Sequence, residues 1–167
     1  MPDPATETEI RQADWYGEDL TGQEHAGVLF SWVDLTEATG DGAIFTDCKF
    51  TGSAFERCTF DLMTVERGDW SFVALPGADL TRATLAGTRL READLTAVRA
   101  AGANLRGLDL SAAALRDADL SGADLRGSDL SAVDPREVDL TGAQIDVAQA
   151  VVLVTALGLR VRPDAPD

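Results

Sequence analysis

Residues 118–127 read Ala-Asp-Leu-Ser-Gly-Ala-Asp-Leu-Arg-Gly, two copies of a five-residue unit with leucine at its centre. Working outward from Leu120 in steps of five, the same register reaches Trp15 in one direction and Ile145 in the other. Of its 27 positions, 24 are apolar, and only His25, Gly40 and Pro135 depart from the pattern. One repeat therefore runs without a slip through most of the 167-residue chain.

The other positions of the unit are patterned as well. Two residues before each centre the side chain is small or apolar, most often alanine. One residue before the centre, which we call the aspartate position, aspartate occurs twelve times. Two residues after the centre, at what we call the turn position, lie 12 of the 15 glycines.

A period of five fits neither a helix, which repeats every 3.6 residues, nor a plain strand, which repeats every two. The pattern fits short extended pieces separated by corners, where a glycine can adopt the positive φ of a tight turn. The centre and the small residue two before it then share the inner face, and the aspartate between them points outward. Such units wind into a solenoid whose coils stack like parallel strands, about 4.8 Å apart.

These residues resemble the pentapeptide repeat family, over residues 13–145. The resemblance implies an all-β solenoid, a right-handed quadrilateral β-helix with four units per coil and about seven coils. Residues 1–12 are then expected to form a flexible N-terminal segment. We expect a relaxed corner or small loop around Gly40. Pro135 is expected to bend or end the regular stack, because proline cannot donate a ladder hydrogen bond.

After Ile145 the sequence changes to a helix pattern, so residues 146–167 are expected to form a C-terminal helix and tail. Asp146 can cap the helix and Gln149 can close a capping box. The helix is apolar nearly all round and needs cover on more than one side. One side can cap the last coil and the other can meet a second subunit; the alternative is a helix folded wholly onto its own coil. The expected dimer-interface residues are Val147, Ala150, Val151, Val154 and Leu157.

Residues 142–151 and 52–60 look like the corresponding segments of the mycobacterial fluoroquinolone-resistance group within this family. This resemblance implies a homodimer joined through the C-terminal helix that binds DNA gyrase, imitates the charge of duplex DNA, and protects the enzyme from quinolones or inhibits it. Some plasmid-borne relatives carry loops that project from the rod, and the unbroken register leaves no room for long loops of this kind here.

The chain carries 29 acidic and 14 basic side chains, a net charge of −15. This charge argues against direct binding of nucleic acid or of an anionic membrane, and favours partners with basic surfaces. Over a rod roughly 30 Å long it gives about one charge per 2 Å, close to the one per 1.7 Å of duplex DNA. Aspartate on the outer surface also keeps a solenoid soluble, so the charge alone leaves both interpretations open.

With four units per coil, residues 20 apart lie on one side of the rod. Face 1 (centres at 15, 35, 55, 75, 95, 115 and 135) and face 2 (centres at 20, 40, 60, 80, 100, 120 and 140) each sum to −5, and the remaining faces to −2 and −1. Residues 1–75 hold −11 of the total. The candidate partner-binding residues on the two faces are Asp14, Asp19, Asp34, Glu37, Asp41, Asp61, Asp79, Asp94, Asp117, Asp119, Asp134 and Asp139.

No catalytic, cofactor-binding or metal-binding motif emerges, so we expect a non-enzymatic protein without a cofactor. The single histidine, His25, is read as an end-coil side chain. Cys48 and Cys58 are read as buried free thiols. Trp32 lies at an outward corner, either as a partner contact or packed over a neighbouring corner. The start of the chain lacks a secretory signal, so the cytoplasm is expected. The alternative function is a structural or adaptor solenoid that presents an acidic surface to another protein.

Overall fold

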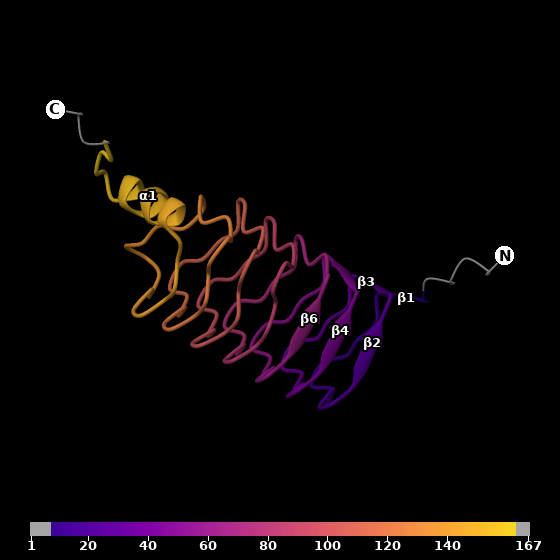
Figure 1. Cartoon of the computed structure of the whole chain (residues 1–167). Coiled ribbons are helices and arrows are strands. Elements are labelled where there is room, and N and C mark those ends of the chain that lie inside the picture. Colours follow the sequence, from indigo (N-terminus) through magenta and orange to yellow (C-terminus); the bar gives the residue numbers. More distant parts are fainter. Residues whose placement is uncertain (1–7, 163–167) are drawn as a thin grey trace.

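The chain folds into a rod of stacked coils, with strand β1 and helix α1 at opposite ends (Figure 1). This computed structural model describes residues 8–162. Strands β1 (Thr8–Arg11), β3 (Val28–Ser31) and β5 (Lys49–Thr51) form one parallel sheet. Strands β2 (Glu24–Ala26), β4 (Ile44–Thr46) and β6 (Thr64–Glu66) form another. The fold expected from the five-residue repeat, a β-helix with parallel strands and one C-terminal helix, is confirmed.

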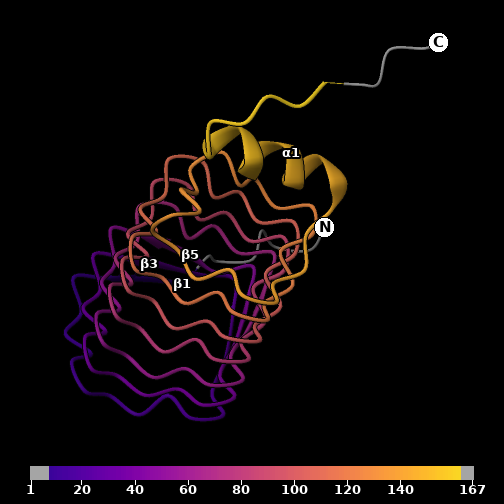
Figure 2. The same cartoon turned by 90° about the vertical axis from the view of Figure 1, so that its left-hand side faces the viewer.

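Every parallel pairing joins residues 20 apart, which confirms four units per coil. Phe30 pairs with Phe50 between β3 and β5, and Phe45 pairs with Val65 between β4 and β6. Isolated bridges continue the same spacing down the rod as far as the pair Asp124 and Gln144. Residues 20 apart therefore lie directly above one another on each face. Figure 2 shows the coils stacked one behind another.

The turn position sets the corners. It has positive φ in every unit from Gln12 to Gly127, and thirteen of these residues are not glycine. Stacking between coils therefore imposes the left-handed conformation even on residues that adopt it rarely. Glycine is favoured at this position, but the register does not require it.

The core changes character along the rod. The N-terminal half holds an aromatic cluster in which Phe30 stacks on Phe50 with ring centroids 4.3 Å apart, and Trp70 lies 4.4 Å from Phe50. His25 stacks on Phe45 at 5.3 Å at the N-terminal edge of this cluster. From Leu75 to Leu130 the centres are leucine except at Ala100, and all are buried.

The solenoid begins earlier than the expected boundary at residue 13. Residues 8–11 form β1, which pairs in register with β3. The physical reason is Ile10, which occupies the next centre position before Trp15 and packs against the core. The expected flexible segment 1–12 is therefore wrong for residues 8–12, and its remainder lies outside the described residues.

The loop expected at Gly40 does not form. Thr39 pairs with both Asp19 and Thr59, so the register passes through this unit unchanged. Gly40 is buried, and the ring of Phe60 in the next coil fills the space in front of it. A large centre in one coil thus compensates for the missing side chain in the coil before.

Pro135 disturbs the stack as expected. In the coil before the break, the backbone N–H of Ala97 donates to the carbonyl of Arg116, 19 residues further along the chain. At the break, the N–H of Asp117 donates to the carbonyl of Glu137, 20 residues further along, so this coil contains one extra residue. Within residues 8–162 the left-handed conformation is absent at turn positions 132 and 137 and returns at Gly142. The break leaves a hollow of about 380 Å³ on face 1, lined in part by Leu115, Asp134 and Val138.

Helix α1 (Val147–Ala156) lies at the C-terminal end of the rod. Asp146 is its N-cap, and the expected capping box with Gln149 is present. The Gln149 side chain is buried, and its Nε2 donates to the carbonyl oxygens of Leu125 at 2.6 Å and Ser128 at 2.8 Å. Together with buried Leu153, it seats α1 along one side of the last coil (Figure 2). No helix within residues 8–162 is long and apolar enough to span a membrane.

Candidate functional site

The aspartate position has a structural role that our reading of the sequence missed. In all twelve units with aspartate there, the carboxylate accepts a hydrogen bond from the backbone N–H two residues further on, at 2.9–3.2 Å. Asn104 does the same at 3.4 Å. This is the turn that aspartate and asparagine side chains favour. The frequent serine or threonine two residues later, as in Asp119-Leu120-Ser121, was the available signal.

Hydrogen bonds lower the pKa of several outer carboxyl groups. Hydrogen bonds from Thr36 hold the pKa of Asp34 below its usual value, and those from Thr141 do the same for Asp139. The pKa of Asp124 falls to about 2, chiefly through its hydrogen bond from Arg126. Hydrogen bonding to the charged form of a carboxyl group favours that form. These hydrogen bonds therefore favour the charged form of Asp34, Asp124 and Asp139.

On face 1 the register brings together Asp14, Asp34, Glu37, Asp94, Asp117 and Asp134. Its three arginines are already engaged: Arg57 with Glu37 at 3.1 Å, Arg116 with Glu137 at 3.7 Å, and Arg136 with Asp134 at 3.4 Å. Within residues 8–162, no ion pair on this face involves Asp14, Asp34, Glu56, Asp94 or Asp117. The tyrosine hydroxyl of Tyr16 donates to Glu37, which the sequence did not predict.

On face 2 the register brings together Asp19, Asp41, Asp61, Asp79, Asp119 and Asp139. Arg82 pairs with Asp61 at 2.5 Å and Arg99 pairs with Asp79 at 2.9 Å. Asp119 and Asp139 lie directly next to each other in adjacent coils. Glu18, Glu56 and Glu137 also lie on these two faces, and the signal for them was the 20-residue spacing rather than the aspartate position.

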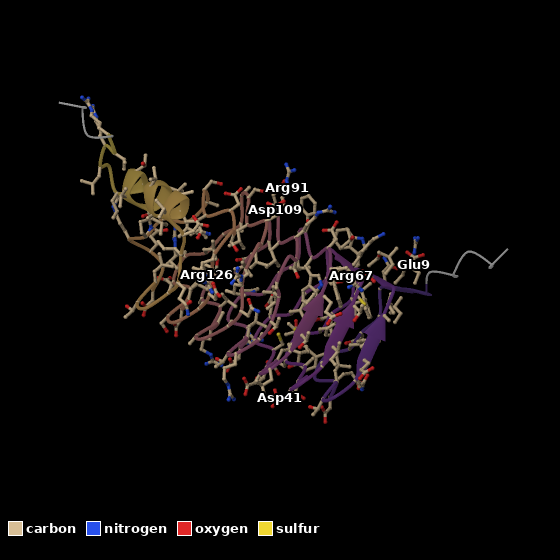
Figure 3. All side chains as sticks on the ribbon, viewed as in Figure 1. Glu9, Asp41, Arg67, Arg91, Asp109 and Arg126 are labelled. Atoms are coloured by element: carbon tan, nitrogen blue, oxygen red, sulfur yellow. The ribbon has the colours of Figure 1, made fainter. Side chains whose placement is uncertain are left out.

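The other two faces are closer to neutral because their charges alternate between coils. Arg89 lies between Asp69 and Asp109 in register, and its ion pair with Asp69 spans 3.6 Å. Arg67, labelled in Figure 3, makes a two-point contact with Asp47 at 2.9 and 3.0 Å. Such exposed pairs add little stability. Because the charges of these two faces largely cancel, most of the net negative charge of the rod lies on faces 1 and 2.

The predicted dimer residues fall into two groups. Exposed side chains are those of Val147 and Val151 on α1 and of its C-cap residue Leu157, with 83% of Val147 accessible, whereas Ala150 and Val154 are half-buried. Val152, which we did not predict, is exposed beside Val151. A helical wheel could not separate these groups, because the helix is apolar on nearly every side.

The remaining candidates are structural. Cys48 and Cys58 are buried free thiols, and burial raises the pKa of each. Among residues 8–162, no group of three or more histidine, cysteine, aspartate or glutamate side chains is arranged to hold a metal ion. Trp32 is 66% exposed, and its ring lies over Gly52 in the next coil, which confirms the packing alternative. Its role as a partner contact stays a prediction.

Solved structures share this fold. A trypsin-treated form of QnrB1, described as a plasmid-mediated fluoroquinolone resistance protein, superposes with a TM-score of 0.65 at 23% identity, covering 96% of this chain and 95% of that one. Full-length QnrB1 gives a TM-score of 0.56 at 20% identity, covering 91% of this chain and 98% of that one. Among curated protein sequences, none matches this chain.

The sequence also matches a family directly. Pentapeptide repeats are recognised in 8 copies, over residues 26–61, 75–111, 93–131 and 118–146. These matches cover both the aromatic and the leucine-rich halves of the rod. The same residues form the coils whose bridges join positions 20 apart. The chain belongs to the pentapeptide repeat family.

Proposed function

We propose that this chain is a non-enzymatic protein that imitates the charge of DNA and binds DNA gyrase or another type II topoisomerase in the cytoplasm. By occupying the basic surface that receives DNA, it would protect the enzyme from fluoroquinolones or other gyrase poisons, or modulate its response to them. The observation that carries this proposal is the pair of adjacent acidic faces on a straight, regularly spaced rod.

Electrostatics supports the proposal. Faces 1 and 2 together hold −10, and the arginines on them are already paired with carboxylates of the same face. Coils spaced about 4.8 Å apart stack the units of each face, so these carboxylates lie along one side of the rod at multiples of the coil spacing. A basic groove built for phosphates would attract such a surface over a long range.

The family resemblance supports the same partner. The C-terminal residues and the segment around Phe55 resemble the mycobacterial group whose members bind gyrase. QnrB1, which shares the fold over nearly the whole chain, is described as a fluoroquinolone resistance protein. At 23% identity that likeness extends to the fold, and the choice of partner is our inference.

We also propose a homodimer joined through α1, with Val147, Ala150, Val151, Val154 and Leu157 in the interface. Only Gln149 and Leu153 of the helix are buried in the single chain. Ile145 and Leu140 of the last coil stay partly exposed beside it. A second copy would cover both apolar surfaces, as the open end of a solenoid requires.

A supercoiling assay with purified gyrase, with and without a fluoroquinolone, tests the function. The matched control replaces Asp14, Asp34, Asp119 and Asp139 by asparagine, which can still accept the turn hydrogen bond, as Asn104 does. We expect the wild-type chain to change supercoiling or drug sensitivity and the neutralised variant to do so much less. No effect of the wild-type chain would reject the proposal.

One observation favours the second candidate, an adaptor solenoid for a different protein. All twelve aspartates at the aspartate position accept a hydrogen bond within a turn. Part of the acidity would therefore arise in this fold without any DNA-like role. A wild-type chain that leaves gyrase unaffected would favour this candidate. A gyrase effect that disappears when the four charges are neutralised would exclude it.

A further inference from the structure

Two large aromatic side chains project from one corner of the rod. Trp32 and Phe72 both occupy turn positions at the corner between face 1 and the neighbouring face that contains β3 and β5. They are 40 residues apart, which places them two coils apart in the 20-residue register. Trp32 is 66% exposed and Phe72 is 55% exposed. Both backbones are left-handed, with φ of 56° and 63°, a conformation that bulky residues adopt rarely.

The residue between them leaves room for one of the rings. Gly52 occupies the same corner in the intervening coil, and a Cβ atom there would lie 2.8 Å from Cε3 of Trp32. The indole ring therefore lies across the backbone of Gly52 and extends toward the coil of Phe72. We call Trp32, Gly52 and Phe72 the aromatic ridge.

The ridge borders the N-terminal half of face 1. From Trp32 the chain turns into Asp34, which pairs in register with Asp14 one coil earlier. Tyr16 on the same face is 56% exposed, and its hydroxyl is held by Glu37. This half of face 1 thus combines exposed aromatic side chains with carboxylates, and residues 1–75 carry −11 of the −15.

Face 2 offers a clear contrast. Among residues 8–162, the large exposed apolar side chain at its outer border is Leu62, also at a turn position and 55% exposed. Leu62 lies 30 residues from Trp32, one and a half coils, and so occupies the diagonally opposite corner. No exposed aromatic side chain accompanies the carboxylates on that side of the described structure.

We propose that the N-terminal half of face 1, with the aromatic ridge along its border, is the surface that meets the topoisomerase. This rests on the function proposed above. The carboxylates would meet the basic DNA-binding surface, and Trp32 and Phe72 would enter an apolar recess at its edge. Tryptophan and tyrosine in such positions commonly dominate binding energy, with charged groups around them. DNA has no counterpart to this ridge, so it would let the enzyme surface distinguish the protein from a duplex.

Binding of gyrase to Trp32→Ala, Phe72→Ala and the double variant tests the proposal, with Leu62→Ala as the matched control. Alanine is accommodated at turn positions, since Ala97 and Ala112 already occupy them with φ of 54° and 56°. We expect the double variant to weaken binding about tenfold or more, as loss of an interface anchor does. Leu62→Ala should change it by less than about twofold, as expected outside the anchor cluster.

A charge-based pair tests the same surface without altering the ridge. Asp14→Asn with Asp34→Asn on face 1 should weaken gyrase binding more than Asp19→Asn with Asp119→Asn on face 2. If the wild-type chain binds gyrase but the ridge variants match Leu62→Ala, or the two asparagine pairs match each other, the inference is overturned and the proposed function stands. If the wild-type chain does not bind gyrase, the proposed function fails and the inference fails with it.

Discussion

The ring of Phe60 fills the space in which a side chain at Gly40 would lie. A Cβ atom at Gly40 would come within 2.1 Å of Cε1 of Phe60, and the ring is fully buried. The glycine at a centre position and the phenylalanine one coil later are therefore a complementary pair. This pairing keeps the register unbroken at the point where the sequence suggested a loop.

Replacing Gly40 by alanine should therefore destabilise the fold. The added methyl group overpacks the core, for which we expect a loss of about 1–3 kcal/mol in the free energy of unfolding, measured by urea titration. Phe60→Leu in the same chain should recover part of the loss by freeing space. Equal stability of Gly40→Ala and the wild type would show that the two residues do not compete for the space.

The turn at Asp139 separates the structural role of aspartate from its charge. Its carboxylate accepts the N–H of Thr141 at 2.9 Å and lies next to Asp119. Asp139→Asn keeps an acceptor and removes a like-charge contact, so its thermal midpoint should stay near the wild-type value. Asp139→Ala leaves the N–H without its partner and should cost about 1 kcal/mol. Equal midpoints for the two variants would contradict the turn role.

His25 should make stability depend on pH in a defined window. Burial lowers its pKa below 6.5, and its buried Nε2 has no hydrogen-bond partner among residues 8–162. The unfolded chain then binds the proton more readily, so the stabilisation from neutral His25 is complete above about pH 6.5 and is lost as the pH falls toward the folded pKa. The lowered pKa values of Asp34 and Asp139 act only at lower pH, below the ordinary carboxyl value of 3.8.

The measurement is the urea midpoint at about pH 7.5 and about pH 5, on either side of the histidine transition. We expect the wild type to lose stability at the lower pH and His25→Phe to lose clearly less. A histidine variant with the same pH dependence as the wild type would assign the effect to other groups.

The exposed apolar side of α1 predicts that the protein is a dimer in solution. Val147→Glu with Val151→Glu places charges on the apolar surface that only a second copy would cover, so sedimentation should change from twice 17.7 kDa to 17.7 kDa. Leu62→Glu, which adds a charge at an exposed corner of the rod, should leave the mass unchanged. A wild-type monomer at micromolar concentration would contradict the dimer.

The repeat made the fold predictable because each position of the unit has one physical demand: a large inward residue, a turn, and an outward polar side chain. The register alone assigned Asp14, Asp34 and Asp94 to one face. Compensation between coils was harder to foresee. Gly40 looks like a break until Phe60 is placed above it, and Ile10 looks like part of a tail until β3 pairs with it.

The candidate surface was only partly predictable for a related reason. Sequence spacing gives the face of each acid, but not which acids are neutralised by ion pairs. Glu37, Asp61, Asp79 and Asp134 turned out to be paired with arginines. The orientation of α1 depended on the buried amide of Gln149, whose two carbonyl partners come from a coil more than 20 residues earlier.

The proposed function requires the acidic rod to occupy the DNA-binding surface of a type II topoisomerase. Displacement of a fluorescently labelled duplex from purified gyrase, followed by anisotropy over a range of salt concentrations, tests it most directly. We predict that the wild-type chain displaces the duplex, that added salt weakens this competition, and that the fourfold asparagine variant competes poorly. A duplex that stays bound at saturating wild-type chain, or displacement unaffected by neutralising the four carboxylates, would contradict the claim.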